Sequence, residues 1–157
     1  MLVKRYMNTQ FNNRKTSQIP WLAIDSEEKI KAKVLSLNRS DKTVELLFKI
    51  KAGYRSGPHR HTCETRIYVI SGKIINHSIK ETFEQGDYCF QASNDTHDEE
   101  FTKNSLIYVN YKSKNDRFVE FLDEHSNVLD TLTMQHFEEM ILAQSKEGSP
   151  KPPPPGV

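Results

Sequence analysis

The sequence has few cysteines and almost no net charge, and each shortage excludes a class of protein. Two cysteines in 157 residues are too few for a disulfide scaffold. We therefore expect Cys63 and Cys89 to be reduced thiols of a cytoplasmic protein, with one possible bridge left open. The 22 Lys and Arg against 21 Asp and Glu leave a net charge of +1. Broad phosphate binding needs clustered basic residues in excess, so no nucleic-acid partner is expected.

Long apolar runs are also missing. No run approaches the roughly 20 residues that span a bilayer, so no membrane partner is expected. The segment Met1–Lys15 carries Lys and Arg without an apolar core or a small-residue cleavage site, and it is not expected to be a secretory signal. Aromatic residues make up 10% of the chain. Together with plentiful Val, Ile and Leu, they indicate one folded domain with a real core.

The composition changes near both ends of the chain. Residues 1–18 are polar and are expected to form a loose arm, whereas residues 19–147 are expected to form the domain. Residues 148–157 are rich in proline, which favours an extended, solvated backbone. This tail is interpreted as an unstructured end, with a ligand for a proline-reading module as the alternative.

Short stretches of alternating polar and apolar residues, separated by turn residues, fill the middle of the chain. This texture predicts an all-β fold, either an antiparallel sandwich or a small barrel. The expected strands are Ile30–Leu37, Thr43–Lys51, Arg66–Ile70, Lys73–Ile79, Tyr88–Gln91, Glu99–Thr102, Ser105–Tyr111 and Arg117–Leu122.

One segment has helical spacing instead. Between Thr131 and Gln144, apolar residues recur at intervals of three and four, which predicts a helix lying across the strands. Asp130 or Thr131 is the expected N-cap.

The pair His59 and His61 is the sharpest chemical feature. Residues two apart in a strand project from the same face, so two imidazoles would lie within reach of one metal ion. A lone His-x-His pair is common by chance, and the surrounding spacing is needed to interpret it. Gly53 precedes His59 by six positions, Gly72 follows His61 by eleven, and a third histidine, His97, lies beyond Gly86.

These spacings resemble the two motifs of the cupin superfamily. The resemblance implies a single cupin jelly-roll barrel with a C-terminal helix, and a metal ion held by His59, His61 and His97. The family's glutamate position falls on Thr65, and Glu64 lies one residue early. A slip of one residue in a strand points a side chain to the opposite face, so a site of three histidines without a carboxylate is expected.

A narrower resemblance fits such a site. The runs Pro58–Thr62, Tyr68–Gly72 and Phe121–Val128 are similar to the three-histidine dioxygenases that cleave dihydroxyacetophenone or acetylacetone. The anti-sigma-factor cupins, which bind zinc, share the first motif but usually keep the glutamate. The resemblance implies a mononuclear metal-dependent dioxygenase that cleaves a C–C bond in a small enolisable ketone, a β-diketone or a hydroxyketone. It implies O2 as the second substrate and a homodimer as the assembly.

Three neutral imidazoles leave the full charge of a divalent cation uncompensated, and an anionic enolate would supply the missing negative charge. One divalent ion is expected, with Fe(II) favoured and Zn(II) or Ni(II) possible. The alternatives are a metal-binding cupin that senses or binds without turnover, and a non-redox cupin such as an isomerase.

Other residues could support such a site. His77 alternates with Ile75 and Ile79, so it is expected to face the interior and border the pocket. Gln91 could orient the substrate or an imidazole, or it could be a solvated strand end. Glu64 is either an acid beside the ligands or a surface charge. Cys63 could be a soft ligand, although a small buried hydrophobic residue is the default interpretation.

Overall fold

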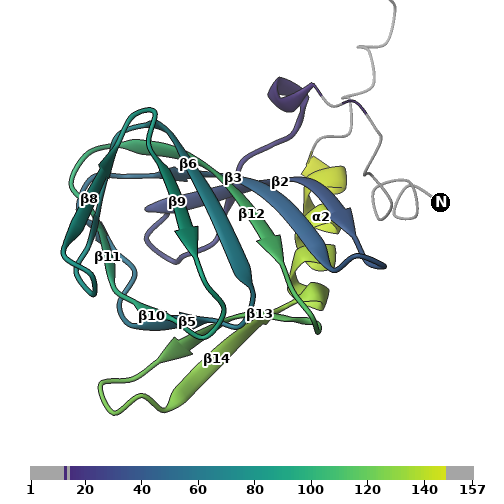
Figure 1. Cartoon of the computed structure of the whole chain (residues 1–157). Coiled ribbons are helices and arrows are strands. Elements are labelled where there is room, and N and C mark those ends of the chain that lie inside the picture. The colour runs from purple at the N-terminus through teal and green to yellow at the C-terminus, as the bar shows by residue number, and fades with distance from the viewer. Residues whose placement is uncertain (1–12, 14, 148–157) are drawn as a thin grey trace, which may run out of the picture.

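The alternating segments form a closed set of antiparallel sheets in the computed structural model, which describes residue 13 and residues 15–147 (Figure 1). This confirms the predicted all-β fold with one C-terminal helix, and each expected strand overlaps an observed one. The elements are η1 (Thr16–Gln18), β1 (Leu22–Ala23), β2 (Ile30–Asn38), β3 (Thr43–Ile50), β4 (Tyr54–Arg55), β5 (His59–His61), β6 (Glu64–Ser71), β7 (Lys73–Asn76), β8 (Glu81–Glu84), β9 (Tyr88–Gln91), β10 (Thr96–His97), β11 (Glu99–Phe101), β12 (Ser105–Lys112), β13 (Arg117–Leu122), β14 (Val128–Thr133) and α2 (Met134–Glu147).

Three sheets enclose the interior of a jelly-roll barrel. The largest has the order β1-β2-β3-β12-β6-β9, and two four-stranded sheets have the orders β10-β5-β13-β14 and β4-β11-β7-β8. The late strand β12 lies between β3 and β6, so it joins segments that are far apart in the sequence. Figure 1 shows α2 lying beside β2, outside the barrel wall.

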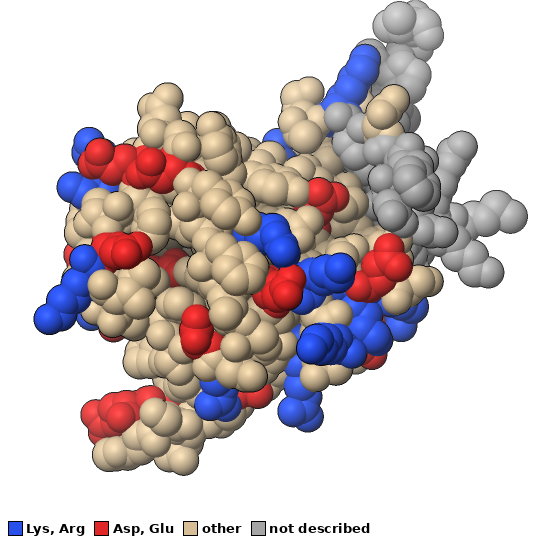
Figure 2. Space-filling model, in the orientation of Figure 1, with Lys and Arg blue, Asp and Glu red and all other residues tan. Residues whose placement is uncertain are grey.

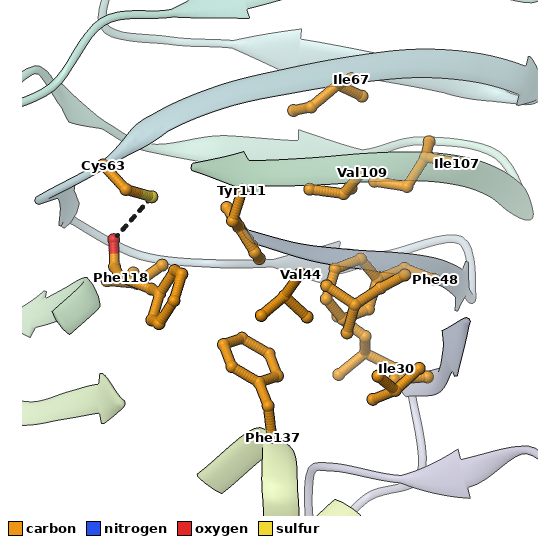
Figure 3. Packing of buried hydrophobic residues seen from close by; sticks show 14 of the residues in the cluster. Ile30, Val44, Phe48, Cys63, Ile67, Ile107, Val109, Tyr111, Phe118 and Phe137 are labelled. Atoms are coloured by element: carbon orange, nitrogen blue, oxygen red, sulfur yellow. Dashed lines mark hydrogen bonds between the residues drawn. The ribbon is translucent and has the colours of Figure 1, made fainter. Parts of the chain in front are cut away.

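The core follows from the period of two along each strand. In β3, Val44, Leu46 and Ile50 are almost fully buried, whereas Lys49 points to solvent. The aromatic rings of Phe118 and Phe137 meet edge to face with centres 5.2 Å apart (Figure 3). Phe137 belongs to α2, so this contact attaches the helix to the barrel.

The helix begins later than the sequence predicts. Residues Thr131–Thr133 belong to β14, which pairs with β13, so the expected N-cap at Asp130 or Thr131 is wrong. Cross-strand hydrogen bonds hold these residues extended, and tertiary pairing therefore overrides the helical spacing. Thr133 precedes the first helical turn, and its Oγ1 lies 2.9 Å from His136 Nδ1.

A buried glutamine fixes the far end of the helix to the sheet. Gln144 accepts a hydrogen bond from Val34 N at 2.7 Å and donates one to Val34 O at 3.1 Å. The neighbouring strand β1 pairs with β2 only at Lys31 and Ala32. The side-chain amide thus satisfies backbone groups of β2 that lie beyond the end of that pairing.

We expect Gln144→Ala to lower the free energy of unfolding by about 2 kcal/mol or more, because two buried backbone groups lose their partner. Urea denaturation of the metal-free protein measures the loss. Gln135→Ala, on the exposed side of the same helix, is the matched control and should cost less than about 0.5 kcal/mol. Equal costs for the two variants would show that the amide does not secure the helix.

Charges of both signs are interspersed on the surface. Figure 2 shows Lys and Arg beside Asp and Glu on one face, with no continuous basic area. Within the described residues, no helix is both long enough and apolar enough to cross a membrane. The boundaries predicted at residues 18 and 147 stay predictions, because most of the arm and all of the proline-rich tail lie outside the described residues.

Candidate metal centre

Three histidines meet inside the barrel. His59 and His61 project from the same face of β5, and His97 of β10 pairs directly with His59. All three side chains are buried. Their ring centres are 5.0 Å apart for His59 and His61, 5.5 Å for His61 and His97, and 6.1 Å for His59 and His97. The fold therefore brings the three sequence-predicted ligands into one cluster.

Each ring is held through its Nδ1 atom. Nδ1 of His59 lies 3.0 Å from the Gly57 carbonyl oxygen, Nδ1 of His61 lies 2.8 Å from Thr65 Oγ1, and Nδ1 of His97 lies 3.0 Å from Asn76 Nδ2. Metal-binding imidazoles commonly donate their Nδ1 proton to an outer partner, as His59 can to the Gly57 carbonyl oxygen. Asn76 instead presents its amide nitrogen to His97, because its Oδ1 already accepts two backbone hydrogen bonds, so Nδ1 of His97 is the acceptor. Metal binding at Nε2 of His97 would therefore need the other tautomer of this ring. All three contacts use Nδ1 and leave Nε2 for another role.

The Nε2 atoms of His61 and His97 are buried and have no hydrogen-bond partner among the described residues. A buried polar atom without a partner is costly, and a bound cation would satisfy it. Burial and the neighbouring rings of His59 and His97 hold the pKa of His61 well below its ordinary value. Burial also lowers the pKa of His97, against the opposing charge of Glu99. Both rings are therefore neutral near pH 7, which is the form that binds metal.

The ring spacing fits one ion only after a small adjustment. An ion about 2 Å from each Nε2 places two ring centres roughly 4.6–5.3 Å apart. The separations of His97 from His61 and from His59 are both wider, and in the described part of the chain no group of three or more His, Cys, Asp or Glu meets the geometry for a metal ion as it stands. Moving the ring of His97 by roughly 1 Å toward the other two would suffice. The donor types and the unpartnered nitrogens fit a metal, and metal binding by these residues stays a prediction.

The position of the family's glutamate is occupied by a hydroxyl. Thr65 is fully buried and contacts His61, whereas the Glu64 side chain is 47% exposed and forms an ion pair with Arg66 at 3.2 Å. The one-residue slip therefore has the predicted consequence, and Glu64 is a surface charge rather than an acid beside the histidines. No carboxylate reaches the site from this strand among its described residues.

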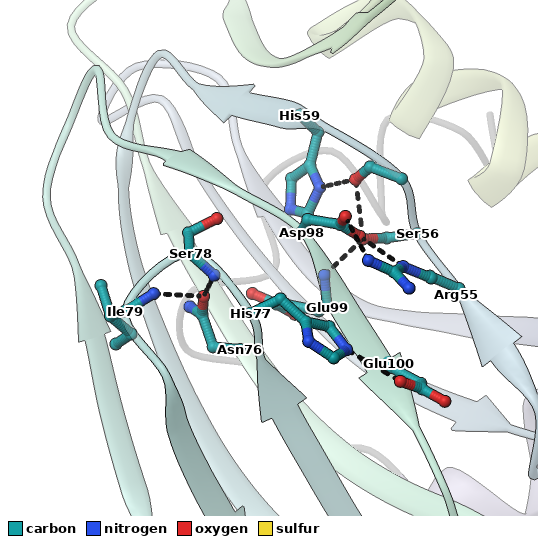
Figure 4. Close-up of polar contacts among 11 residues, drawn as sticks. Arg55, Ser56, His59, Asn76, His77, Ser78, Ile79, Asp98, Glu99 and Glu100 are labelled. Carbon is teal, nitrogen blue, oxygen red and sulfur yellow. Dashed lines mark hydrogen bonds and ion pairs between the residues drawn. The ribbon is translucent and has the colours of Figure 1, made fainter. Parts of the chain in front are cut away.

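The expectation that His77 faces the interior is wrong. His77 is exposed, and its Nε2 lies 2.8 Å from Glu100 Oε2 (Figure 4). The strand ends at Asn76, whose Oδ1 accepts hydrogen bonds from the N–H groups of Ser78 and Ile79 and closes a turn. Asn76 takes the inward position and contacts His97. The apolar Ile79 belongs to this turn and is exposed. Counting Ile79 as an inward strand position therefore led to the wrong orientation for His77.

A small cavity adjoins the histidines. Its volume is about 130 Å³, and its walls are mainly apolar. Gln91 lies in this wall, as one of its two interpretations expects, and its Nε2 donates a hydrogen bond to Glu99 Oε1 at 2.6 Å. Gln91 Oε1 is buried without a partner among the described residues.

Sequence reasoning missed Glu99 as a cavity residue. It is buried, and it lies two residues after His97, so both side chains face the interior. Strand parity counted from His97 was the signal that could have found it. For Asn76, strand parity was misleading, because the turn that follows this residue ends the alternation of inward and outward side chains.

The two cysteines are free and buried, which confirms their interpretation as small hydrophobic residues. Burial raises the pKa of Cys63 to about 11 and that of Cys89 to about 12. Cys63 Sγ donates a hydrogen bond to the Phe118 carbonyl oxygen at 3.3 Å (Figure 3). A thiol in this state is a poor metal ligand, since metals bind the thiolate.

A jelly-roll barrel with a His-x-His pair on one strand and a third histidine on the next defines a cupin. The family model described as the ChrR cupin-like domain matches residues 10–115, and the chain belongs to this family. No curated protein matches the sequence.

Solved structures share the fold at low identity. An RmlC-like cupin protein from Ralstonia eutropha JMP134 is 14% identical, with a TM-score of 0.79 over 98% of this chain and 97% of that chain. A candidate acetylacetone dioxygenase from Methylibium petroleiphilum PM1 is 15% identical, with a TM-score of 0.74 over 83% of this chain and 93% of that chain. An acetylacetone dioxygenase from Acinetobacter johnsonii is 15% identical, with a TM-score of 0.72 over 86% and 92%. At this identity the likeness establishes the fold alone.

Proposed function

We propose that this protein is a mononuclear metal-dependent dioxygenase that uses O2 to cleave a C–C bond in a small enolisable ketone. The observation that carries the proposal is a cluster of three buried imidazoles beside an apolar cavity, with a threonine where the family has its glutamate. His59, His61 and His97 would hold one divalent ion, with Fe(II) favoured and Zn(II) or Ni(II) possible.

The charge of the site supports an anionic ligand. When bound, a divalent cation favours the enolate form of a β-diketone or hydroxyketone and fixes its orientation. Three neutral imidazoles do not compensate the cation, so the enolate completes the charge balance. Among the described residues that line the cavity, Glu99 is the carboxylate, and one of its oxygens is already bound by Gln91.

Residues of this chain orient the three imidazole rings and exclude water from the cavity. The Gly57 carbonyl oxygen, Thr65 and Asn76 fix the three rings, so the Nε2 atoms are positioned before a ligand arrives. Apolar walls keep water away from the reacting ketone. Gln91 orients the substrate, because its unpartnered Oε1 can accept a hydrogen bond from a second hydroxyl group of a hydroxyketone bound as its enolate.

We also propose that the protein is a homodimer located in the cytoplasm. Exposed Tyr68, Tyr88 and Phe90 on the outer faces of β6 and β9 support a homodimer. Two buried free thiols support a cytoplasmic location. Two structural neighbours that carry acetylacetone dioxygenase names support the choice of substrate class.

A metal-binding cupin without turnover is the second candidate. The observation that favours it is the family match itself, because the description of the ChrR cupin-like domain names no reaction. A non-redox isomerase is the remaining alternative on this fold, because one fold supports several chemistries.

Oxygen uptake separates these candidates. The protein is reconstituted without oxygen with Fe(II), Zn(II) or Ni(II), analysed for metal content, and then mixed with acetylacetone or a hydroxyacetophenone in air-saturated buffer. We expect consumption of one O2 per ketone with Fe(II). His77→Ala, which changes an exposed histidine of the same barrel, should leave the rate unchanged. Stoichiometric metal without O2 uptake would favour the second candidate.

A further inference from the structure

The cavity beside the histidines is small compared with many ketones. Its volume of about 130 Å³ is close to the roughly 150 Å³ of an engineered cavity that holds benzene. A five-carbon diketone would therefore fill it. A larger substituent on the same head group would have to extend beyond this cavity.

One part of that wall also borders a much larger groove. Ile24, Phe48, Phe121 and Leu132 line both the cavity and a groove of about 760 Å³. Ile24 is 44% exposed and Phe121 is 38% exposed, so these side chains are only partly covered from the groove side. The two spaces thus share these side chains as part of their lining.

The groove has the chemistry of an apolar binding surface. It runs between the strand β1, the hairpin strand β14 and the helix α2, which lies beside the barrel in Figure 1. Trp21, Leu22, Met140 and Ala143 contribute apolar surface. The charged residues that border it are mainly acidic, namely Glu28, Asp130 and Glu139 beside Lys31, so the lining disfavours an anionic occupant. Apolar surface that continues into a cavity with a few polar groups is typical of a ligand site.

We propose that this groove binds the apolar arm of the substrate, an alkyl- or aryl-substituted 1,3-dicarbonyl compound whose head group lies in the cavity beside His59 and His61. The inference rests on the proposed function, because the head group must be held there. On this proposal the groove selects the length of the apolar arm, and the histidines select the chemistry of the head group. Ile24 and Phe121 form the passage between them.

Binding of diketones with different arms tests the proposal. Zn(II)-loaded protein, which cannot oxidise the ketone, is titrated calorimetrically with 2,4-pentanedione and with 2,4-nonanedione. We expect the Kd of the longer compound to be lower by at least about tenfold, because four added methylenes leave water. Ala143→Trp fills the groove and should remove this preference while leaving the Kd of 2,4-pentanedione unchanged.

Leu142→Trp is the matched control, because Leu142 is the adjacent exposed residue of α2 and does not line the groove. That variant should keep the tenfold preference. Equal Kd values for the two diketones in the unmodified protein would overturn this inference and leave the proposed function standing. If 2,4-pentanedione itself fails to bind the loaded protein, both the inference and the proposed function are overturned. A dimer that Ala143→Trp dissociates, with no dependence of Kd on arm length, would assign the groove to a second copy and overturn the inference.

Discussion

Replacing His97 with alanine is expected to abolish stoichiometric metal binding and to reduce affinity by at least about 100-fold. The variant leaves only the two imidazoles of β5, and the ring of His97 is the part of the cluster that comes from a different strand. Elemental analysis after desalting measures the metal content. Titration with Zn(II) gives the affinity.

The fold should survive this change. The removed ring carries a buried Nε2 without a partner among the described residues, so its loss also removes an unfavourable group. Circular dichroism of the metal-free variant should therefore resemble that of the unmodified protein. His77→Ala is the control for histidine content, and it should bind metal normally because His77 is exposed. Full metal content in His97→Ala would place the third ligand elsewhere, with Glu99 as the nearest inward carboxylate along the chain.

Gly72→Ala is expected to cost roughly 3 kcal/mol or more of unfolding free energy, the largest effect on stability that we predict. Gly72 joins β6 and β7 with φ of +100°. A Cβ atom built there would lie 2.1 Å from Ser105 Oγ and 2.5 Å from Ser105 Cα, so the side chain cannot simply rotate away. Ser105 belongs to the neighbouring strand β12, and the backbone of that strand would have to move.

Gly86→Ala is the matched control. Gly86 has φ of +89°, but a Cβ atom there would meet nothing within 4 Å. The left-handed backbone alone should cost about 1–2 kcal/mol. Urea denaturation of both variants without metal gives the comparison. Equal losses would show that the close approach to Ser105 contributes nothing beyond backbone strain.

The short-range patterns of this sequence were enough for the all-β class and for the pairing of His59 with His61, whereas the resemblance to the cupins supplied the jelly-roll barrel and the third ligand, His97. A period of two places His59 and His61 on one face, and the same parity separates buried Thr65 from exposed Glu64. These features depend only on the alternation of side chains along a strand, which any extended segment obeys.

The same rule failed where a strand ended early or paired in an unforeseen way. The turn closed by Asn76 sent His77 to the surface, and pairing with β13 made Thr131–Thr133 a strand instead of a helical turn. Neither outcome can be read from local residue types. Each depends on which distant segment lies alongside.

The sequence by itself determined the all-β architecture, the terminal helix and the shared face of His59 and His61, and its resemblance to the cupins indicated His97 as their partner. Only the tertiary structure decided that Asn76, Thr65 and Gly57 contact the rings, that Glu99 shares the cavity with Gln91, and that Ile24 and Phe121 line both this cavity and a groove. The physical reason is the distance along the chain over which each feature is determined. Side-chain direction is a local property of the backbone, whereas cavities and hydrogen-bond partners arise where segments far apart in the chain come together.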